Sequence, residues 1–315
     1  MNKDTYDVII IGGGIAGMTA AIYAARANLR TVVLEREICG GLVNSTYMVE
    51  NFPSYPAIHG MELMGKVSDH MRLLGVTVEE VTDIVEMKLG GEWKTVATDE
   101  SAYDARAVIL ATGRKPVPLT VAEECQQVHY CSICDGIGYK DKRILVVGGG
   151  NSGFDEALYL RSLGVGHITL IEMADRFFAS PLIQRELLAC TNVSARTSTR
   201  VKAIVSQDRL KAVVLEDVVT GQIQEVSVDG IFVYMGQHPN TEMLRDCIDL
   251  DDSGYIVTGS RMETNISGVF AAGDVVQKIY RQITTAMADG TVAALAVERY
   301  LREHFGTSCL NHDDN

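Results

Sequence analysis

Short apolar runs that end at glycine recur along this chain, and such runs are typical of buried parallel strands. The first covers residues 6–11 and leads into a stretch rich in Ala, Met and Ile, residues 15–28, that predicts a helix. Another apolar run over residues 31–35 predicts the next strand. The same order of strand, helix and strand returns at residues 143–147, 152–163 and 167–172. The chain therefore contains two copies of a βαβ unit.

Two more apolar runs, residues 107–113 and 230–236, also end at glycine and are followed within a few residues by proline. Because proline cannot continue a ladder of strand hydrogen bonds, we expect the chain to cross between domains at these points. A further strand over residues 268–274 and a long amphipathic helix over residues 281–304 follow the second crossing. The predicted fold class is α/β, with two Rossmann-like nucleotide-binding domains.

Each βαβ unit carries glycines where its first strand turns into its helix. The first glycine of such a loop makes the turn, the second lets the backbone approach a pyrophosphate, and the third lets the helix pack close to the strand. An acid at the end of the next strand is spaced to bind ribose hydroxyls. These positions are Gly12, Gly14, Gly17 and Glu35 in the first unit and Gly148, Gly150, Gly153 and Glu172 in the second. The pattern predicts two dinucleotide sites.

Glu172 bears on which nicotinamide the second site accepts. A carboxylate at this position accepts hydrogen bonds from ribose hydroxyls and repels a 2′-phosphate, which would instead need arginine. Residues 172–178 contain one arginine, Arg176, whose plain interpretation is a solvated turn. If a nicotinamide binds here, NADH is therefore favoured over NADPH.

Cys131 and Cys134 form a C-x-x-C pair between the two glycine loops. Such a pair can be half of a metal site or a thiol–disulfide pair, or it can occur by chance. A structural zinc needs four ligands, normally two such pairs, and the sequence has no second pair. Cys125 and His129 are poorly spaced to complete a site, so no metal is expected. The two flanking dinucleotide sites favour a redox pair, because together they make an electron path that ends at the dithiol.

Asp135 follows the pair directly. Its charge would disfavour a thiolate, so proton transfer is its better role: a positioned carboxylic acid can protonate a leaving sulfur. The alternative is that Asp135 is a turn residue ahead of Gly136.

Composition excludes several classes of function. The chain has 315 residues, of which 47% are hydrophobic, and a net charge of −13, whereas nucleic-acid binding needs basic patches. No uninterrupted apolar run is long enough to span a bilayer, so no membrane partner is expected. The start runs directly into the first strand, so we expect no signal peptide. Seven cysteines with one motif pair fit a reducing compartment, so we expect a cytoplasmic protein.

With these motifs in this order, the chain resembles the low-molecular-weight thioredoxin reductases over nearly its whole length. The motifs that carry the resemblance are residues 12–17, 49–53, 111–113, 131–136, 148–153, 268–274 and 280–282. The resemblance implies an FAD-binding domain of residues 1–114 and 240–315. It also implies an inserted pyridine-nucleotide domain of residues 115–239 that carries the dithiol. A homodimer, and a rotation that presents the flavin in turn to the nicotinamide and to the dithiol, are implied as well.

The same resemblance implies roles for single residues. Cys134 would face the flavin, Cys131 would attack the disulfide of thioredoxin or a thioredoxin-like protein, and Asp135 would be the acid. Besides the glycines and acids of the two loops, the residues implied to line the cofactors are Ala16, Arg36, Gly41, Leu42, Asn51, Ala111, Thr112, Gly113, Gly273, Asp274, Arg281, Gln282 and Ile283.

The chain departs from the family around the second loop. Members that use NADPH carry a His-Arg-Arg run and a further arginine, where this chain has Glu172, Met173, Ala174 and Phe178. The residue after Gly153, usually small, is Phe154, and we expect its ring to crowd a pyrophosphate. NADPH is therefore disfavoured, NADH is compatible, and ferredoxin or another reduced carrier is an alternative that uses no nicotinamide. Two other functions stay open: a small-molecule dithiol oxidase, and a flavin redox sensor with an inactive donor site.

Overall fold

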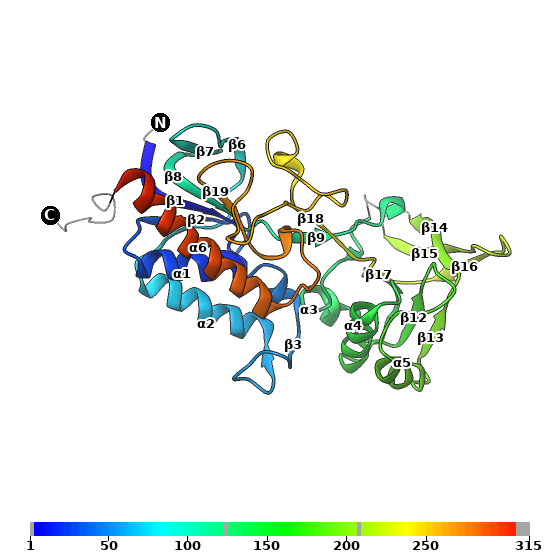
Figure 1. Ribbon diagram of the computed structural model, residues 1–315. Coiled ribbons are helices and arrows are strands. Elements are labelled where there is room, and N and C mark those ends of the chain that lie inside the picture. Colours follow the sequence, from blue (N-terminus) through cyan, green and yellow to red (C-terminus); the bar gives the residue numbers. More distant parts are fainter. Residues whose placement is uncertain (1–2, 123–124, 207–208, 307–315) are drawn as a thin grey trace. The chain divides into compact units, whose positions relative to one another are not determined.

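The computed structural model describes residues 3–122, 125–206 and 209–306 (Figure 1). The chain divides into two compact units. Unit 1 consists of residues 1–115 and 238–315, and unit 2 of residues 116–237. The crossings expected at residues 114/115 and 239/240 lie within two residues of these limits. The connecting segments β9 (Arg114–Pro116) and β18 (Gln237–Pro239) pair with each other, and each strand ends at its proline.

The main sheet of unit 1 is largely parallel, and β1 lies near its middle. Its strands run in the order β5 (Thr77–Glu79), β2 (Thr31–Leu34), β1 (Lys3–Ile11), β8 (Ala102–Leu110), β7 (Lys94–Thr98) and β6 (Ile84–Lys88). One edge of β8 is shared between two partners. Its first half pairs antiparallel with β7, and its second half pairs parallel with β19 (Val269–Ala271), which comes from near the C-terminus.

Both faces of this sheet are covered, which explains the continuous apolar runs. Along β1, Val8 and Ile10 enter one core while Ile9 and Ile11 enter the other, as the two-residue period of a strand requires. Three helices cover the first face: α1 (Ile15–Arg26), α2 (Gly60–Leu73) and α6 (Ile283–Phe305). They lie side by side in Figure 1. A small hairpin of β3 (Met48–Val49) and β4 (Ile58–His59) precedes α2.

Unit 2 repeats this plan with a five-stranded parallel sheet. The strand order is β10 (Val128–His129), β17 (Gly230–Val233), β11 (Arg143–Val147), β12 (His167–Ile171) and β13 (Val193–Arg196). The α-helices in the described part of this unit are α3 (Ser132–Asp135), α4 (Asn151–Ser162) and α5 (Pro181–Leu188). The two Rossmann-like domains expected from the sequence, one inserted in the other, are thus confirmed.

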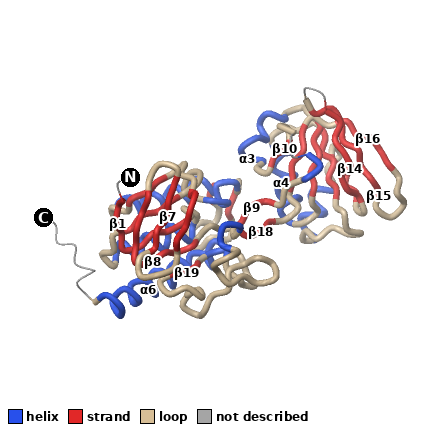
Figure 2. Tube along the Cα trace, turned by 90° about the horizontal axis from the view of Figure 1, so that it is seen from above, coloured by secondary structure: helices blue, strands red, loops and turns tan. Residues whose placement is uncertain are grey.

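Unit 2 also holds an antiparallel sheet that the pattern did not predict. Its strands are β14 (Thr199–Ser206), β15 (Leu210–Asp217) and β16 (Ile223–Ser227), which lie side by side in Figure 2. Val201, Val213 and Leu215 from this sheet join Leu145 and Ile231 of the parallel sheet in one core. Within the described residues, no helix is both long and apolar enough to cross a membrane.

Candidate functional site

The first glycine loop joins β1 to α1 and has the shape of a phosphate cradle. Gly12 has φ +104°, and a Cβ there would lie 2.3 Å from the carbonyl oxygen of Ala111, so only glycine fits. At Gly14 a Cβ would have no described atom within 4 Å, which leaves the backbone open to a ligand. Glu35 Oε2 accepts a hydrogen bond from Gly13 N at 2.5 Å, and its Oε1 accepts one from Glu37 N at 2.9 Å.

The second loop, between β11 and α4, reproduces this geometry. Gly148 has φ +122°, and a Cβ there would lie 2.2 Å from the carbonyl oxygen of Tyr234, whereas Gly150 is open. Glu172 Oε2 accepts from Gly149 N at 2.7 Å, and Oε1 accepts from Ala174 N at 2.9 Å. At the third position of the two loops, a Cβ on Gly17 or Gly153 would lie 1.9 Å from the carbonyl oxygen of the loop's first glycine. The two loops are therefore duplicates in structure as well as in sequence.

Several residues expected to line the flavin gather around the first loop. A Cβ on Gly273 would lie 2.7 Å from Ala16 Cβ, so the turn after β19 packs directly on α1. Gly41 and Leu42 begin the short helix η1 (Gly41–Ser45), and a Cβ on Gly41 would approach Gly14 Cα to 3.2 Å. Arg36 instead forms an exposed ion pair with Asp83 at 2.9 Å.

The turn after β8 is held by a residue that the sequence did not single out. Thr112 Oγ1 donates to the carbonyl oxygen of Asn240 at 2.8 Å, and Asn240 Nδ2 donates to the carbonyl oxygen of Thr112 at 2.9 Å. Asn240 N also donates to Gly113 O at 3.0 Å, and Ala111 N donates to Ile11 O at 2.7 Å. Ala111, Thr112 and Gly113 thus lie directly beside the first glycine loop.

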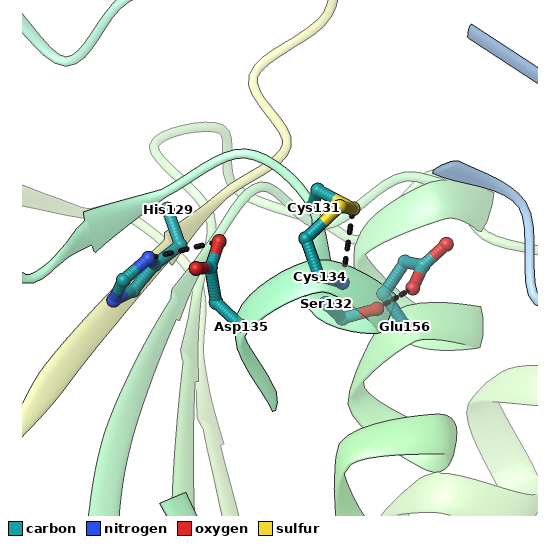
Figure 3. Close-up of a disulfide and its surroundings, with 6 residues drawn as sticks. All are labelled: His129, Cys131, Ser132, Cys134, Asp135 and Glu156. Carbon is teal, nitrogen blue, oxygen red and sulfur yellow. Dashed lines mark hydrogen bonds and ion pairs between the residues drawn. A yellow bond between two sulfur atoms is a disulfide. The ribbon is translucent and has the colours of Figure 1, made fainter. Parts of the chain in front are cut away.

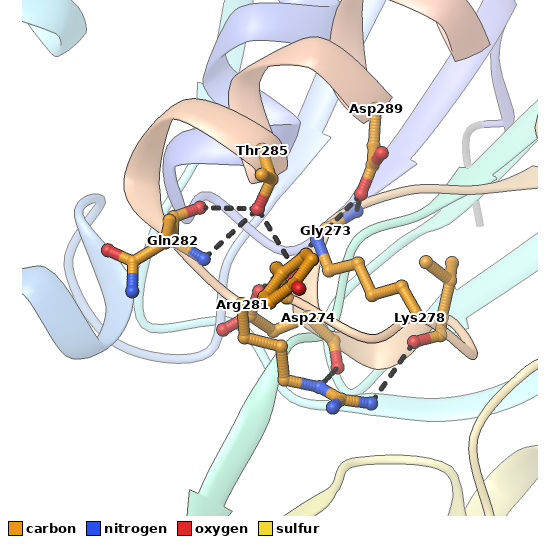
Figure 4. Close-up of polar contacts among 9 residues, drawn as sticks. Gly273, Asp274, Lys278, Arg281, Gln282, Thr285 and Asp289 are labelled. Carbon is orange, nitrogen blue, oxygen red and sulfur yellow. Dashed lines mark hydrogen bonds and ion pairs between the residues drawn. The ribbon is translucent and has the colours of Figure 1, made fainter.

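The start of α6 joins two distant segments. Gln282 is the N-cap of this helix, Ile283 is its first residue, and Gln282 and Thr285 form a capping box (Figure 4). Asn51 Nδ2 donates to Gln282 Oε1 at 3.2 Å. The Asn51 motif and the Gln282 motif, 231 positions apart in sequence, therefore meet at a helix N-terminus, where anionic or electron-rich groups are favoured.

Asp274 provides a direct test of whether a cofactor fits here. Its Oδ1 is buried and accepts no hydrogen bond from any residue that the structure describes, although Lys278 Nζ forms an ion pair with it at 3.4 Å. Lys278 points mainly to Asp289, at 2.7 Å, and Arg281 donates to the backbone oxygens of Asp274 and Val276 (Figure 4). A buried acceptor without a donor is costly. The hydroxyl groups of a dinucleotide would satisfy it, so the residues present fit FAD.

The redox pair lies at the start of α3 in unit 2. Cys131 and Cys134 are joined in a disulfide, and Cys131 is the N-cap of the helix, its Sγ accepting from Cys134 N at 3.2 Å (Figure 3). Cys134 is exposed and Cys131 is half-buried. Within the described ranges, no group of three or more His, Cys, Asp or Glu side chains is arranged to hold a metal ion.

Asp135 does not stand alone beside this disulfide. Its Oδ2 lies 3.0 Å from His129 Nδ1, and the other ring nitrogen, Nε2, lies 2.6 Å from the Tyr139 hydroxyl. The His129 ring also packs against Phe232, with ring centroids 5.1 Å apart. Burial, with Asp135 as a second cause, raises the pKa of Tyr139 to about 12, so its hydroxyl keeps its proton.

A second acid lies on the other side of the disulfide. Glu156, on α4, accepts a hydrogen bond from the fully buried Ser132 hydroxyl (Figure 3). Burial raises the pKa of Glu156, with the nearby charge of Asp155 as a smaller contribution, against the lowering effect of the Ser132 hydrogen bond. The buried hydroxyl of Tyr234 is near this cluster, and burial also raises the pKa of Tyr234.

Comparison with known proteins agrees with this geometry. The family model described as pyridine nucleotide-disulphide oxidoreductase matches residues 6–290. The chain belongs to this family. It is 43% identical to a 34.2 kDa protein in the rubredoxin operon of Clostridium pasteurianum, over 94% of this chain and 97% of that protein. It is 39% identical to a thioredoxin reductase of Bacillus subtilis, over 95% of each chain.

Solved structures show more closely which type of oxidoreductase this is. A thioredoxin reductase of Lactococcus lactis matches with a TM-score of 0.88 and 36% identity, covering 95% of this chain and 99% of that one. A ferredoxin-flavin thioredoxin reductase of Clostridium acetobutylicum matches with a TM-score of 0.54 and 26% identity, covering 96% and 100%. The protein is therefore a flavoprotein disulfide reductase of the thioredoxin reductase type, with the Cys131–Cys134 pair as its redox disulfide.

One expectation for this oxidoreductase is wrong in detail. Phe154 was expected to crowd a pyrophosphate, but its ring is 0% exposed and packs in the core below the loop. It contacts Phe177 edge-to-face, with centroids 5.2 Å apart, while Gly150 remains open. The ring points inward because position 154 lies on the face of α4 that covers the sheet, together with Ala157 and Leu160.

The oxidoreductase also has functional candidates that the sequence analysis missed. His129 was considered as a metal ligand and set aside, and Ser132, Glu156 and Asn240 were not considered. A signal existed for His129 because it lies six positions before Asp135 at the end of a short strand. Ser132 and Glu156 gave none, since 24 positions separate them and the contact depends on how α3 packs on α4.

Proposed function

We propose that this oxidoreductase transfers electrons to the disulfide of thioredoxin or a thioredoxin-like protein, and that its electron donor is NADH or another carrier but not NADPH. The observation that carries the donor proposal is the Glu172 carboxylate, held by two backbone N–H groups at the ribose end of the second loop. A 2′-phosphate would meet this negative charge directly. Arg176 offers little compensation, because its guanidinium lies over the Phe178 ring, 5.3 Å from the centroid.

The first loop and the start of α6 are proposed to hold FAD. Gly12, Gly14 and Gly17 would receive the pyrophosphate, Glu35 the ribose, and Asp274 the hydroxyl groups of the ribityl chain. Bound FAD would supply a two-electron carrier between the donor and the Cys131–Cys134 disulfide. The remaining chemistry belongs to the residues of unit 2.

In the proposed reaction, Cys134 accepts electrons on the flavin side, and Cys131 attacks the partner's disulfide. Attack requires a thiolate, and the sulfur that leaves the partner must gain a proton. Asp135 is the proposed acid for this step. Its position directly after Cys134 in α3 supports this role. Two electrons and two protons then pass from the enzyme's dithiol to the partner, and the Cys131–Cys134 disulfide forms again.

A ferredoxin-type donor is the alternative to NADH. Thioredoxin has a reduction potential of about −270 mV, and both NADH and low-potential ferredoxins are reducing enough to supply its electrons. The related structure from Clostridium acetobutylicum is named a ferredoxin-flavin thioredoxin reductase, and this name supports a donor other than a nicotinamide. The open backbone at Gly150 supports NADH instead. The homodimer and the rotation between domains that the resemblance implies stay predictions.

The experiment is anaerobic mixing of the oxidised, FAD-loaded protein with NADH, NADPH and reduced ferredoxin in turn, with the loss of flavin absorbance as the signal. We expect NADH or ferredoxin to reduce the flavin, and NADPH to react more slowly and bind more weakly than NADH. Saturable reduction by NADPH with tighter binding than NADH would contradict the donor proposal. Oxygen consumption with a small dithiol but no reduction of thioredoxin would support the dithiol oxidase. A flavin that no donor reduces, beside a dithiol that reduces no partner, would support the redox sensor.

A further inference from the structure

Three side chains extend from the redox disulfide into unit 2 in an unbroken series. Asp135, at the end of α3, meets His129 Nδ1 at 3.0 Å, and His129 Nε2 meets the hydroxyl of Tyr139, in the short helix η3 (Gly136–Tyr139), at 2.6 Å. Figure 3 shows the Asp135 carboxylate turned toward the imidazole. The Asp135 side chain is 41% exposed and the His129 side chain 14%. The carboxylate therefore lies where solvent can reach it, and the imidazole lies behind it.

The His129 ring is fixed on several sides. The Tyr139 ring packs edge-to-face against it at 5.2 Å between centroids, and Phe232 of β17 lies at 5.1 Å. The Tyr139 hydroxyl keeps its proton and can either donate to Nε2 or accept from it. The imidazole can therefore stay in place whether it is neutral, with Nε2–H donating to Tyr139 and Nδ1 open to a proton from Asp135, or carries a second proton on Nδ1.

Other titratable or charged groups near this series are few. The charges that act on Tyr139 besides Asp135 come from Cys125, upstream of β10, and Asp229, ahead of β17. Lys142 lies 5.3 Å from the centroid of the Tyr139 ring. These three groups border Tyr139. Among the described residues, Asp135 is the charged group that pairs with His129 itself.

We propose that His129 is a positioning residue that turns Asp135 into a proton shuttle at neutral pH. Asp135 exchanges the proton with sulfur, and the imidazole of His129 holds it between transfers. An isolated aspartic acid titrates near pH 3.9 and holds a proton in only about one molecule in a thousand at pH 7, whereas imidazole titrates in the neutral range. This inference rests on the proposed role of Asp135 as the acid.

The proton and electron balance follows directly. The Cys131 thiol gives its proton to the pair, and the thiolate forms a bond to one sulfur of the partner while the partner's disulfide breaks. The pair returns the proton to the sulfur that leaves. Cys134 then attacks Cys131, the mixed disulfide breaks, and the proton of Cys134 passes to the second partner sulfur. Two electrons and two protons reach the partner, and the pair ends as it began.

The test compares two substrates that differ in their need for an acid. The proteins compared are wild type, His129→Asn, Tyr139→Phe and Asp135→Asn. Each is reduced anaerobically with dithiothreitol, which is then removed. The reduced protein is mixed, between pH 5 and pH 9, with oxidised Bacillus subtilis thioredoxin or with the aromatic disulfide 5,5′-dithiobis(2-nitrobenzoate). The aromatic thiolate leaves readily without a proton. Asparagine at position 129 can still donate a hydrogen bond to Asp135 but cannot hold the proton. His167→Asn, at a histidine on β12 that contacts Ser194, is the matched control.

We expect His129→Asn to slow thioredoxin reduction by about tenfold or more at pH 7. The rate with the aromatic disulfide should stay within about twofold of the wild-type rate. The defect with thioredoxin should shrink toward pH 5, where a lone carboxyl begins to hold its own proton. Tyr139→Phe should show the same pattern more weakly, and His167→Asn should match wild type. An equal loss on both substrates, or a thioredoxin rate unchanged at every pH, would overturn the proposal for His129. If Asp135→Asn also left the thioredoxin rate unchanged, the proposed acid itself would be wrong.

Discussion

Two carboxyl groups flank the disulfide, and their surroundings give them different properties. Asp135 is partly exposed and paired with His129, so its proton can exchange with groups outside the core. Glu156 is buried, accepts from Ser132, and has its pKa raised by that burial. The environment of each carboxyl, rather than its type, therefore decides which of them can serve as the acid.

The first residue-scale prediction concerns the cysteines. Cys131→Ser and Cys134→Ser should each abolish reduction of thioredoxin, because the two sulfurs form one relay. Each variant should keep its flavin, since the residues that fit FAD lie in unit 1. Absorbance spectra measure the bound flavin, and turnover with thioredoxin is measured with whichever donor is competent. A variant that kept most of its turnover would show that the relay is wrong.

The second concerns Glu156 and pH. A carboxyl whose pKa is higher in the folded state than in the unfolded state binds more protons when folded. Its contribution to stability is therefore lost as pH rises from the ordinary glutamate value of 4.5 through the raised value. Glu156→Gln cannot titrate and should make the free energy of unfolding less dependent on pH over that window. Urea unfolding at several pH values measures this, and parallel curves for variant and wild type would contradict it.

At the scale of elements, the two nucleotide loops share one design and differ in the segment that follows β2 in unit 1 and β12 in unit 2. In unit 2 the segment after β12 is tied to the glycine turn by backbone hydrogen bonds from Phe178 and Ala179 to Gly149 O. Met173 and Phe178 on this segment are 63% and 57% exposed. Its exposed side chains, rather than the buried Phe154, are therefore the ones that a nucleotide bound at this loop would meet.

This arrangement gives an element-scale prediction for donor choice. Met173→Arg, Ala174→Arg and Phe178→Arg together should strengthen NADPH binding by about tenfold or more relative to wild type, because guanidinium groups bind phosphate in bidentate fashion. Calorimetric titration measures the affinity. Phe154→Val is the control: it removes core volume, so it should lower stability by roughly 1–3 kcal/mol and leave NADPH binding unchanged. A gain in NADPH affinity from Phe154→Val alone would show that the buried ring does restrict the site.

Local signals explain which parts of the site the sequence predicted. The glycine turns and the C-x-x-C pair depend on neighbours a few positions away, and the acids follow the glycines at the fixed spacing of one βαβ unit, so spacing alone identifies them. His129 with Asp135, and Asn240 with Thr112, depend on tertiary packing and were missed. The β14–β16 sheet was missed for a related reason. Arg200 and Lys211 are exposed between buried neighbours, but the register shift between Val201 and Ala203 breaks the alternation along β14.

At the scale of the whole molecule, the duplicated loops belong to separate units, so each cofactor should order its own unit. Restoring FAD to depleted protein should protect residues 12–17, 111–113 and 273–283 from hydrogen exchange and leave residues 148–153 unchanged. NADH, if it binds, should protect residues 148–153 and 172–180. Hydrogen exchange followed by mass spectrometry measures both responses. Protection of the second loop by FAD alone would contradict the assignment of FAD to the first loop.

The shared edge of β8 has a consequence for how the chain is made. Its second half pairs with β19, a strand synthesised some 160 residues after β8, whereas residues 116–237 of unit 2 are continuous in sequence. Since domains fold as units during translation, unit 2 can complete its fold on the ribosome while unit 1 waits with an unpaired strand edge. Such edges are sites of aggregation. Nascent chains that stop before Val269 are therefore the form of this protein that most needs a chaperone.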